Sequence, residues 1–218
     1  MSTDQARTGV FITLEGMDGC GKSTKGRMLN EELTAKGREV VMLRDPGSTA
    51  ISERIREILL DPEAKDMVPD CELLLFEAAR AQLTCEVIKP ALERGAVVVC
   101  DRYTDSTFAY QAVGRRLDEQ TVRQANVFGS CGLTPDRTIV FDLEVDESFE
   151  RATRHGTDRM ELDGESFQAR VREGYLRLAA EDPARVRVVN GHGEKIEVYA
   201  RMREELKDLF PELMEELA

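Results

Sequence analysis

The sequence predicts an α/β fold in which a doubly wound, five-stranded parallel sheet is flanked by helices. Short apolar runs rich in β-branched residues alternate with longer segments of helical period, as in successive βαβ units. The first four runs are almost continuously apolar, which is typical of strands that helices cover on both faces. The expected strands are residues 10–15, 39–43, 96–101, 138–143 and 186–190.

Helices are expected between and after these strands. Residues 70–93 are apolar almost all round, which predicts a long helix that crosses the core. Residues 194–216 have the pattern of an amphipathic surface helix. No repeat, low-complexity tract or linker interrupts the chain, and 218 residues are enough for one compact core but few for two. We therefore expect a single domain that spans residues 1–218.

The composition argues against several classes of protein. Lys and Arg number 30 against 42 Asp and Glu, and this net charge of −12 disfavours general binding to nucleic-acid backbones or anionic membranes. No window approaches the ~18 apolar residues of a membrane span, and residues 1–10 lack a secretory-signal pattern, so we expect a cytoplasmic protein. The five cysteines are odd in number and form no CxxC pair, so we expect reduced thiols that mostly fill the core.

A glycine-rich loop follows the first expected strand. Residues 16–23 read GMDGCGKS, which fits G-x-x-x-x-G-K-[ST] at every fixed position and precedes a helical stretch. Backbone N–H groups of such a loop cradle phosphate oxygens, Lys22 can reach the β- and γ-phosphates, and Ser23 can bind Mg²⁺. The motif predicts a P-loop NTPase fold with a nucleotide triphosphate site, and a glycine-rich turn without a ligand is the alternative. The expected nucleotide-binding residues are Gly16, Met17, Asp18, Gly19, Cys20, Gly21, Lys22, Ser23 and Thr24.

Asp101 and Arg102 end the third expected strand, at the edge of the sheet where ligands bind in such folds. With Ser23, Asp101 can hold Mg²⁺, and the guanidinium of Arg102 can bind a second anion. Taken alone, the two residues also fit a surface ion pair. The sequence lacks the tetrapeptide N-K-x-D, which argues against a GTPase. It also lacks the pentapeptide L-S-G-G-Q, which argues against a transporter-type ATPase. A small phosphotransferase remains.

Five sequence blocks together form a specific pattern: LEGMDGCGKST (14–24), RDPGST (44–49), LLLFEAARAQ (73–82), DRYTDSTFAYQ (101–111) and RATRHGTDRME (151–161). These blocks resemble the thymidylate kinase family, whose members transfer the γ-phosphoryl group of ATP to dTMP. The resemblance covers nearly the whole chain. It implies a nucleoside monophosphate kinase of dTTP biosynthesis that uses ATP and Mg²⁺, makes dTDP and ADP, and pairs as a homodimer.

The resemblance also implies how thymine is bound. Phe76 and Arg80 are i, i+4 neighbours on the expected 70–93 helix and so share one face. The family stacks the ring at position 76 on thymine and lets the arginine at position 80 donate to a base carbonyl. Without the resemblance, Phe76 fits a core aromatic better.

The block at 101–111 supplies further contacts to the acceptor. The family assigns Thr107 and Gln111 to the base and Tyr110 to the sugar, where a bulky ring leaves no space for a ribose 2′-OH. Ser106 belongs to the same block, and a helix N-cap is its other interpretation.

The acceptor phosphate needs cations of its own. Arg56 and Arg102 are our candidates because arginine binds phosphate bidentately and keeps its charge. A solvated surface arginine is the alternative for Arg56. Asp45 stands where the family usually has glutamate in a REPGGT block, so we expect it near the acceptor without a defined role.

Arginines are expected to neutralise the charge of the transferring phosphoryl group. Position 19, which is arginine in some thymidylate kinases, is glycine here. The segment around residues 151–161 resembles the arginine-bearing lid of the bacterial type, and we expect its closure to bring arginines onto the ATP phosphates. A solvated charged loop is the alternative for some of them. The expected catalytic residues are Lys22, Asp18, Asp101, Arg102, Arg151, Arg154 and Arg159.

Two other functions stay open at this point. A deoxynucleoside kinase shares the P-loop, but it must deprotonate a 5′-hydroxyl, for which Asp45 would be the base. A non-catalytic nucleotide-binding protein would keep the loop without turnover. The intact Lys22, Ser23 and Asp101 argue against the second alternative.

Overall fold

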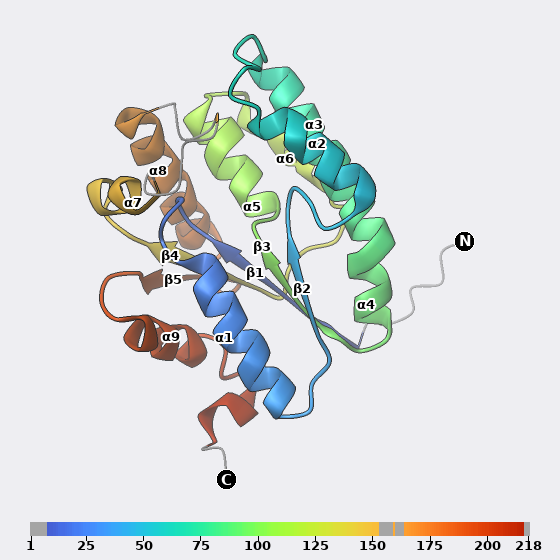
Figure 1. Ribbon diagram of the computed structural model, residues 1–218, viewed down its shortest axis with the longest axis vertical. Coiled ribbons are helices and arrows are strands. Elements are labelled where there is room, and N and C mark those ends of the chain that lie inside the picture. Colours follow the sequence, from blue (N-terminus) through green and yellow to red (C-terminus); the bar gives the residue numbers. More distant parts are fainter. Residues whose placement is uncertain (1–7, 153–158, 160–163, 216–218) are drawn as a thin grey trace.

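Five parallel strands form one sheet in the order β2-β3-β1-β4-β5 (Figure 1). The computed structural model describes residues 8–152, 159 and 164–215. The central strand β1 pairs with β3 on one side and with β4 on the other. The predicted α/β fold is confirmed, and each strand lies within one residue of its expected bounds. The strands are β1 (Val10–Glu15), β2 (Val40–Arg44), β3 (Val97–Asp101), β4 (Arg137–Asp142) and β5 (Val186–Asn190).

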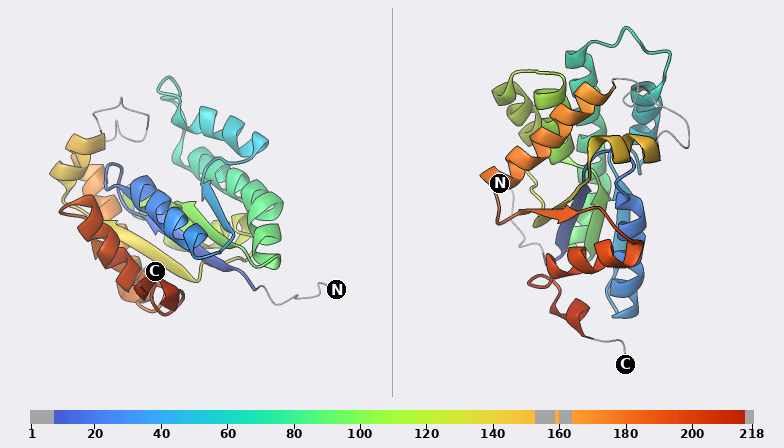
Figure 2. Two further views of the ribbon diagram at one scale, coloured as in Figure 1. Left: turned by 60° about the horizontal axis from the view of Figure 1, so that its bottom comes forward. Right: turned by 90° about the vertical axis from the view of Figure 1, so that its left-hand side faces the viewer.

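Helices cover both faces of the sheet (Figure 2). The π-helices η1 (Thr84–Ile88) and η2 (Phe108–Gly114) continue α3 and α5, and a 3₁₀ turn, η5 (Pro211–Met214), follows α9. The α-helices are α1 (Lys22–Ala35), α2 (Ala50–Leu60), α3 (Pro69–Leu83), α4 (Lys89–Glu93), α5 (Thr104–Thr107), α6 (Glu119–Gly129), α7 (Val145–Ala152), α8 (Glu165–Glu181) and α9 (Lys195–Glu204).

Alternate residues of the strands face two different layers of helices. Ile12 and Leu14 of β1 pack with Leu29 and Leu33 of α1, in a cluster that also contains Met202 of α9. On the opposite face, apolar residues of β1 and β3 pack against η1 and α4, while those of β4 pack against η2 and α8. Both faces of the inner strands β1, β3 and β4 are therefore dry, which explains why these strands are apolar without alternation.

The expected helix over residues 70–93 is helical throughout but changes its winding. It consists of α3, the π-helix η1 and α4 in direct succession. Pro90 lacks an N–H group, and its ring would crowd the preceding turn of an α-helix. The wider π turn ends two residues before this proline.

The C-terminal segment differs from the single surface helix expected over residues 194–216. The helix α9 ends at Glu204, before the 3₁₀ turn that begins with Pro211. Leu206, Phe210 and Leu213 are buried and join the core cluster on the α1 face. The segment after α9 therefore folds back and covers part of this core cluster.

The cysteines do not mostly fill the core, so that expectation was wrong. Cys20 and Cys100 are buried, but Cys71 and Cys85 are exposed and Cys131 is half-buried. Within the described residues, no helix is both long enough and apolar enough to cross a membrane.

Candidate active site

The P-loop connects the carboxyl end of β1 to the first turn of α1. Gly16, Gly19 and Gly21 have φ angles of 129°, 80° and 88°, a region that other L-residues rarely adopt. Position 19 thus suits glycine and would strain an arginine. Gly21 is the N-cap of α1, so the loop presents the positive end of this helix to a cavity of about 840 Å³, which we call the P-loop cavity.

The nucleotide-binding residues predicted from the motif fall into two groups, those that line the P-loop cavity and those that do not. Gly16, Met17 and Cys20 lie outside the lining of the P-loop cavity, and Met17 and Cys20 have buried side chains. The ammonium group of Lys22 donates hydrogen bonds to the backbone carbonyls of Gly16 (3.0 Å) and Met17 (2.9 Å). The P-loop cavity is lined by Asp18, Gly19, Gly21, Lys22, Ser23, Thr24, Arg44, Asp45, Arg56, Asp101 and Arg102.

Ser23 and Asp101 form the candidate magnesium site. The hydroxyl of Ser23 donates to Asp101 Oδ2 at 2.8 Å. The other carboxylate oxygen, Oδ1, is buried and accepts no hydrogen bond from the described residues. A hydroxyl and a carboxylate are oxygen ligands of the kind that Mg²⁺ prefers alongside substrate phosphates. The residues present therefore fit this ion.

Arg102 lies at the centre of the site. Its φ angle of 70° is strained for a residue other than glycine, and such strain is typical of functional positions. Its Nη2 donates to Asp18 Oδ1 (2.6 Å) and to the hydroxyl of Tyr110 (3.1 Å), while its Nη1 donates to the hydroxyls of Ser106 (3.2 Å) and Tyr175 (3.1 Å). These four hydrogen bonds hold the guanidinium in one orientation.

The pKa values of two carboxyl groups beside Arg102 are shifted in opposite directions. Burial alone would raise the pKa of Asp18, but the positive charges of Arg102 and Lys22 outweigh it and lower the pKa to about 2. Burial and the nearby charge of Asp105 raise the pKa of Glu15 to about 7. Asp18 is therefore ionised at neutral pH, whereas Glu15 is close to half-protonated.

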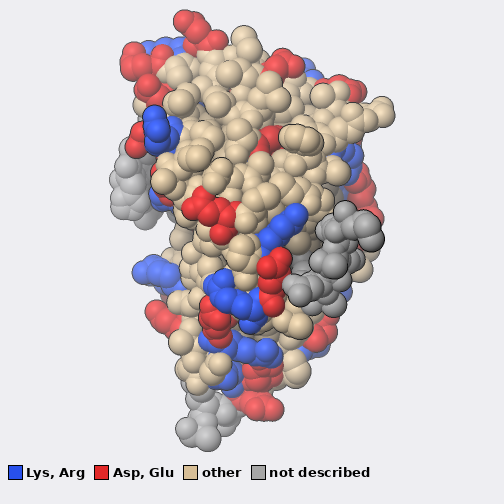
Figure 3. All heavy atoms as spheres, turned by 90° about the vertical axis from the view of Figure 1, so that its right-hand side faces the viewer, with Lys and Arg blue, Asp and Glu red and all other residues tan. Residues whose placement is uncertain are grey.

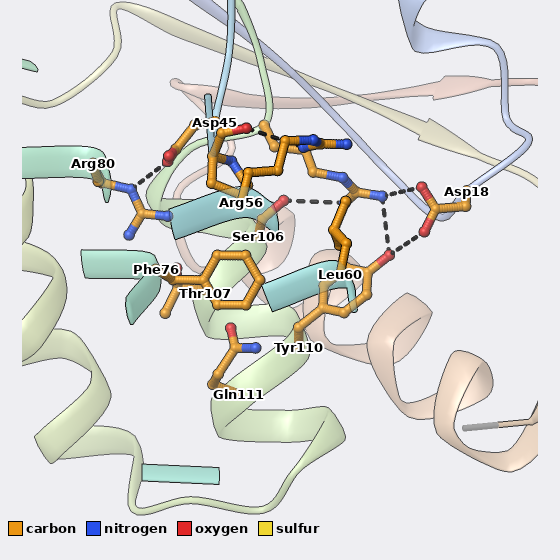
Figure 4. Close-up of a pocket in the computed structure, with 12 residues that line it drawn as sticks. Asp18, Asp45, Arg56, Leu60, Phe76, Arg80, Ser106, Thr107, Tyr110 and Gln111 are labelled. Carbon is orange, nitrogen blue, oxygen red and sulfur yellow. Dashed lines mark hydrogen bonds and ion pairs between the residues drawn. The ribbon is translucent and has the colours of Figure 1, made fainter. Parts of the chain in front are cut away.

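A second cavity of about 530 Å³ adjoins the first (Figure 4). We call it the Phe76 cavity. Asp18, Asp45, Arg56 and Arg102 line both cavities, so two arginines stand at their common boundary. The lining includes every residue that we expected to bind the acceptor. The Phe76 cavity is lined by Asp18, Asp45, Pro46, Arg56, Leu60, Phe76, Arg80, Arg102, Ser106, Thr107, Tyr110 and Gln111.

Arg80 is fully buried at the side of the Phe76 cavity. Its Nε donates to Asp45 Oδ2 (2.7 Å), and its Nη1 donates to Glu77 (2.6 Å) and Asn126 (2.9 Å). Its Nη2 donates to the backbone carbonyl of Tyr103 (3.2 Å). Asp45 therefore serves first as the partner of a buried arginine. That contact explains why an acid follows β2.

The comparison with protein families decides between the candidate phosphotransferases. The family model described as thymidylate kinase matches residues 14–202. The chain belongs to the thymidylate kinase family. The matched region contains both cavities and every described residue that lines them.

Individual relatives agree with this membership. The chain is 49% identical over 210 residues to a thymidylate kinase of Pseudomonas fluorescens strain Pf0-1, an alignment that covers 95% of this chain and 98% of the relative. It is 44% identical to a thymidylate kinase of Bifidobacterium longum, over 92% and 98% of the two chains. The crystal structure of thymidylate kinase from Ehrlichia chaffeensis superimposes with a TM-score of 0.75 at 31% identity, over 91% of this chain and 98% of the other.

The arginines expected in the lid of this kinase are only partly described. Arg154 lies outside the described residues, and so does the side chain of Arg151 at the end of α7. Arg159 is described, and it lines neither cavity. Its Nη2 donates to Glu72 Oε2 at 2.6 Å, and its Nε donates to the backbone carbonyl of Leu59 at 2.9 Å. In this conformation Arg159 is thus engaged with α2 and α3 instead of the P-loop.

Two buried carboxylates of the site were not predicted from the sequence. Glu15 accepts hydrogen bonds from the backbone of Tyr103 and from Ser106 and Tyr175, and Glu72 accepts from Gln111. The signal for Glu15 was a single carboxylate at the end of a strand that is otherwise uncharged and mostly apolar. Glu72 resembled an ordinary acidic residue in the first turn of a helix, which hid its role.

Proposed function

We propose that this protein is the kinase that transfers the γ-phosphoryl group of ATP to dTMP, giving ADP and dTDP for dTTP biosynthesis in the cytoplasm. The observation that carries the proposal is the pair of adjoining cavities with Arg56 and Arg102 at their boundary. One cavity has a P-loop for a triphosphate, and the other has an aromatic ring and amide and hydroxyl groups suited to a pyrimidine nucleotide.

The chain's own residues act mainly by positioning and charge neutralisation. Phosphoryl transfer needs its two oxygens in line and its negative charge balanced, with little covalent work by the protein. Lys22 faces the donor phosphates, while Arg102 and Arg56 face the acceptor phosphate. A magnesium ion held by Ser23 and Asp101 would supply further positive charge at the β- and γ-phosphates. The acceptor oxygen is already anionic, so no general base is required.

We also propose that residues 151–161 form a lid within a single domain. Arg151, Arg154 and Arg159 would contact the donor phosphates in its closed state and exclude water. For Arg159 this requires release from Glu72. The support for the lid is the resemblance of this segment to the bacterial type of the family.

A homodimer is the second part of the proposal. Leu74 of α3 and Val127 and Phe128 of α6 are 65%, 65% and 84% exposed, although these two helices pack together. Figure 3, which faces the side of α2, α3 and α4, shows a broad area with few charged side chains. Exposed apolar groups at this density are typical of a protein interface, and a second copy of the chain is the partner that the family resemblance implies.

The deciding experiment offers MgATP with dTMP, dUMP, dCMP and thymidine in a coupled assay for ADP. We expect transfer to dTMP at the highest kcat/KM. Transfer to thymidine alone would instead indicate a deoxynucleoside kinase. MgATP binding without transfer to any acceptor would indicate a non-catalytic nucleotide-binding protein.

A further inference from the structure

Gln111 faces the Phe76 cavity from η2, and a buried carboxylate lies behind it. Glu72, in the first turn of α3, is 1% exposed and accepts a hydrogen bond from Gln111 Nε2 at 2.9 Å. An ionised carboxylate has acceptors only, whereas a side-chain amide has a donor end and an acceptor end. As long as Glu72 is ionised, the nitrogen of Gln111 must therefore face it.

Arg115 keeps Glu72 ionised, and in this conformation Arg159 adds to its effect. Arg115 donates from Nε to Oε1 and from Nη2 to Oε2, at 3.0 Å each, and Arg159 Nη2 donates to Oε2 at 2.6 Å. Burial alone would raise the pKa of Glu72, but the hydrogen bonds from Arg115, Gln111 and Arg159 outweigh it and lower the pKa. The orientation of the Gln111 amide then follows from chemistry and not only from the coordinates.

With its nitrogen on Glu72, Gln111 turns its carbonyl oxygen to the cavity. Figure 4 shows this oxygen directed toward the ring of Phe76, on which the base is expected to stack. Within the described part of the chain, no hydrogen bond reaches this oxygen. The cavity thus offers a fixed acceptor to the edge of a bound pyrimidine.

We propose that Glu72 is a specificity-determining positioning residue, which fixes the amide of Gln111 so that the kinase selects a pyrimidine carrying a proton on N3. Thymine and uracil have this N3–H group. Cytosine has a lone pair at N3, which would face the carbonyl oxygen and leave a buried acceptor unpaired. The proposal rests on the proposed function, since it concerns the acceptor of the same reaction.

Glu72→Gln is the variant that tests this assignment. Among the described residues, only guanidinium N–H groups face Oε2, and these groups cannot accept, whereas Oε1 faces Gln111 as well as one guanidinium N–H. The new amide nitrogen is therefore best accommodated at the Oε1 position, where it donates to the oxygen of Gln111, whether or not Arg159 stays on Oε2. The amide of Gln111 then reverses and turns its nitrogen into the cavity.

We expect the ratio of kcat/KM for dTMP to that for dCMP to fall about tenfold in Glu72→Gln. The ratio for dTMP to dUMP should stay the same, because both substrates carry N3–H. A merely structural role for Glu72 would lower activity on all three substrates alike. The matched control is Glu119→Gln, since Glu119 is also held by an arginine, Arg177, but lies at the surface; it should change neither ratio.

Gln111→Leu serves as a second, independent variant. It removes the carbonyl oxygen that accepts from the base and leaves Arg115 and Arg159 unchanged. It should lower the dTMP to dCMP ratio and leave the dTMP to dUMP ratio alone. Adding Glu72→Gln to Gln111→Leu should then have no further effect on either ratio. The proposal is overturned if either single variant leaves the dTMP to dCMP ratio unchanged, or if both ratios fall together. Absence of transfer to dTMP in the unmodified enzyme would instead overturn the proposed function.

Discussion

Glu15 shows how one buried carboxyl group organises the strained turn at Arg102. Its Oε1 accepts the backbone N–H of Tyr103 at 2.8 Å, directly after the residue with φ 70°. Its Oε2 accepts hydrogen bonds from the hydroxyls of Ser106 (2.5 Å) and Tyr175 (2.9 Å). These two hydroxyls in turn accept hydrogen bonds from Nη1 of Arg102. Glu15 therefore supports both the backbone and the side-chain partners of the central arginine.

The pKa of Glu15 makes the stability of the protein depend on pH. Its raised value of about 7, against a usual 4.5, means that the folded state binds a proton that the unfolded chain has lost. Between these two pH values the free energy of unfolding falls as pH rises, by about 3 kcal/mol in all for this group. Glu15→Gln cannot titrate and should lose this contribution. Chemical denaturation at pH 5 and pH 8 measures it.

The comparison must be made between the unmodified protein and the variant, since other groups also titrate. The decline in unfolding free energy from pH 5 to pH 8 should be steeper in the unmodified protein. Glu119→Gln changes an exposed ion pair, so its unfolding free energy should decline with pH as steeply as that of the unmodified protein. Equal pH dependence in the unmodified protein and in Glu15→Gln would show that Glu15 has an ordinary pKa.

Individual side chains of the site differ in how far the sequence reveals them. Phe76 and Arg80 were predicted from helical spacing and the family blocks, which place them on one face, and both line the Phe76 cavity. The contact of Arg159 with Glu72 joins residues 87 positions apart and leaves no local pattern. Long-range ion pairs of this kind follow from packing and not from sequence spacing.

At the scale of elements, the strands were predictable and the π-helices were not. A strand covered on both faces must be apolar along its whole length, so the sequence displays it directly. The winding of η2 carries no such signature, because its residues would also suit an α-helix. Its position depends on α8, with which it shares the apolar cluster that contains Tyr110, Phe167 and Tyr175.

The contact between α8 and η2 leads to a prediction for Gly174. Helix propensity favours alanine over glycine by about 1 kcal/mol in a helix interior. A Cβ atom at position 174 would, however, lie 2.8 Å from the Cα of Ala109 and 3.2 Å from Val113 Cγ2. The backbone of η2 would have to move, so we expect Gly174→Ala to lower the free energy of unfolding by roughly 1–3 kcal/mol.

Thermal unfolding measures this effect, at roughly 3 °C for each kcal/mol in a chain of this size. The displaced η2 carries Tyr110 and Gln111, so KM for dTMP should rise as well. Glu173→Ala changes an exposed neighbour on the same helix and should stay within about 0.5 kcal/mol of the unmodified protein. A Tm for Gly174→Ala at or above that of the unmodified protein would show that propensity outweighs the close contact.

At the scale of the whole molecule, the distribution of charge fits a binder of anions. The net charge of −12 repels polyanions in general, yet Lys22, Arg56 and Arg102 concentrate positive charge at two adjoining cavities. Both the acidic total and the cationic residues of the site are evident from the sequence. Their convergence at the carboxyl ends of β1, β2 and β3 follows from the parallel sheet.

The exposed apolar surface on α3 and α6 yields a prediction for the assembly. Phe128 is 84% exposed at the end of α6, and burial of such a ring at the centre of an interface contributes strongly to binding. Phe128→Asp would place a charge in that interface at a cost of roughly 2–4 kcal/mol, which raises the dimer Kd about 30-fold or more. We expect the unmodified protein to sediment as a dimer and Phe128→Asp to dissociate to monomers at low micromolar concentration.

Ile196→Asp is the control. It changes a residue of α9 that is 66% exposed and lies away from α3 and α6, so this variant should remain dimeric. Because Asn126 of the same helix bonds Arg80, loss of pairing should also weaken dTMP binding. A dimer that survives Phe128→Asp would place the interface on another face.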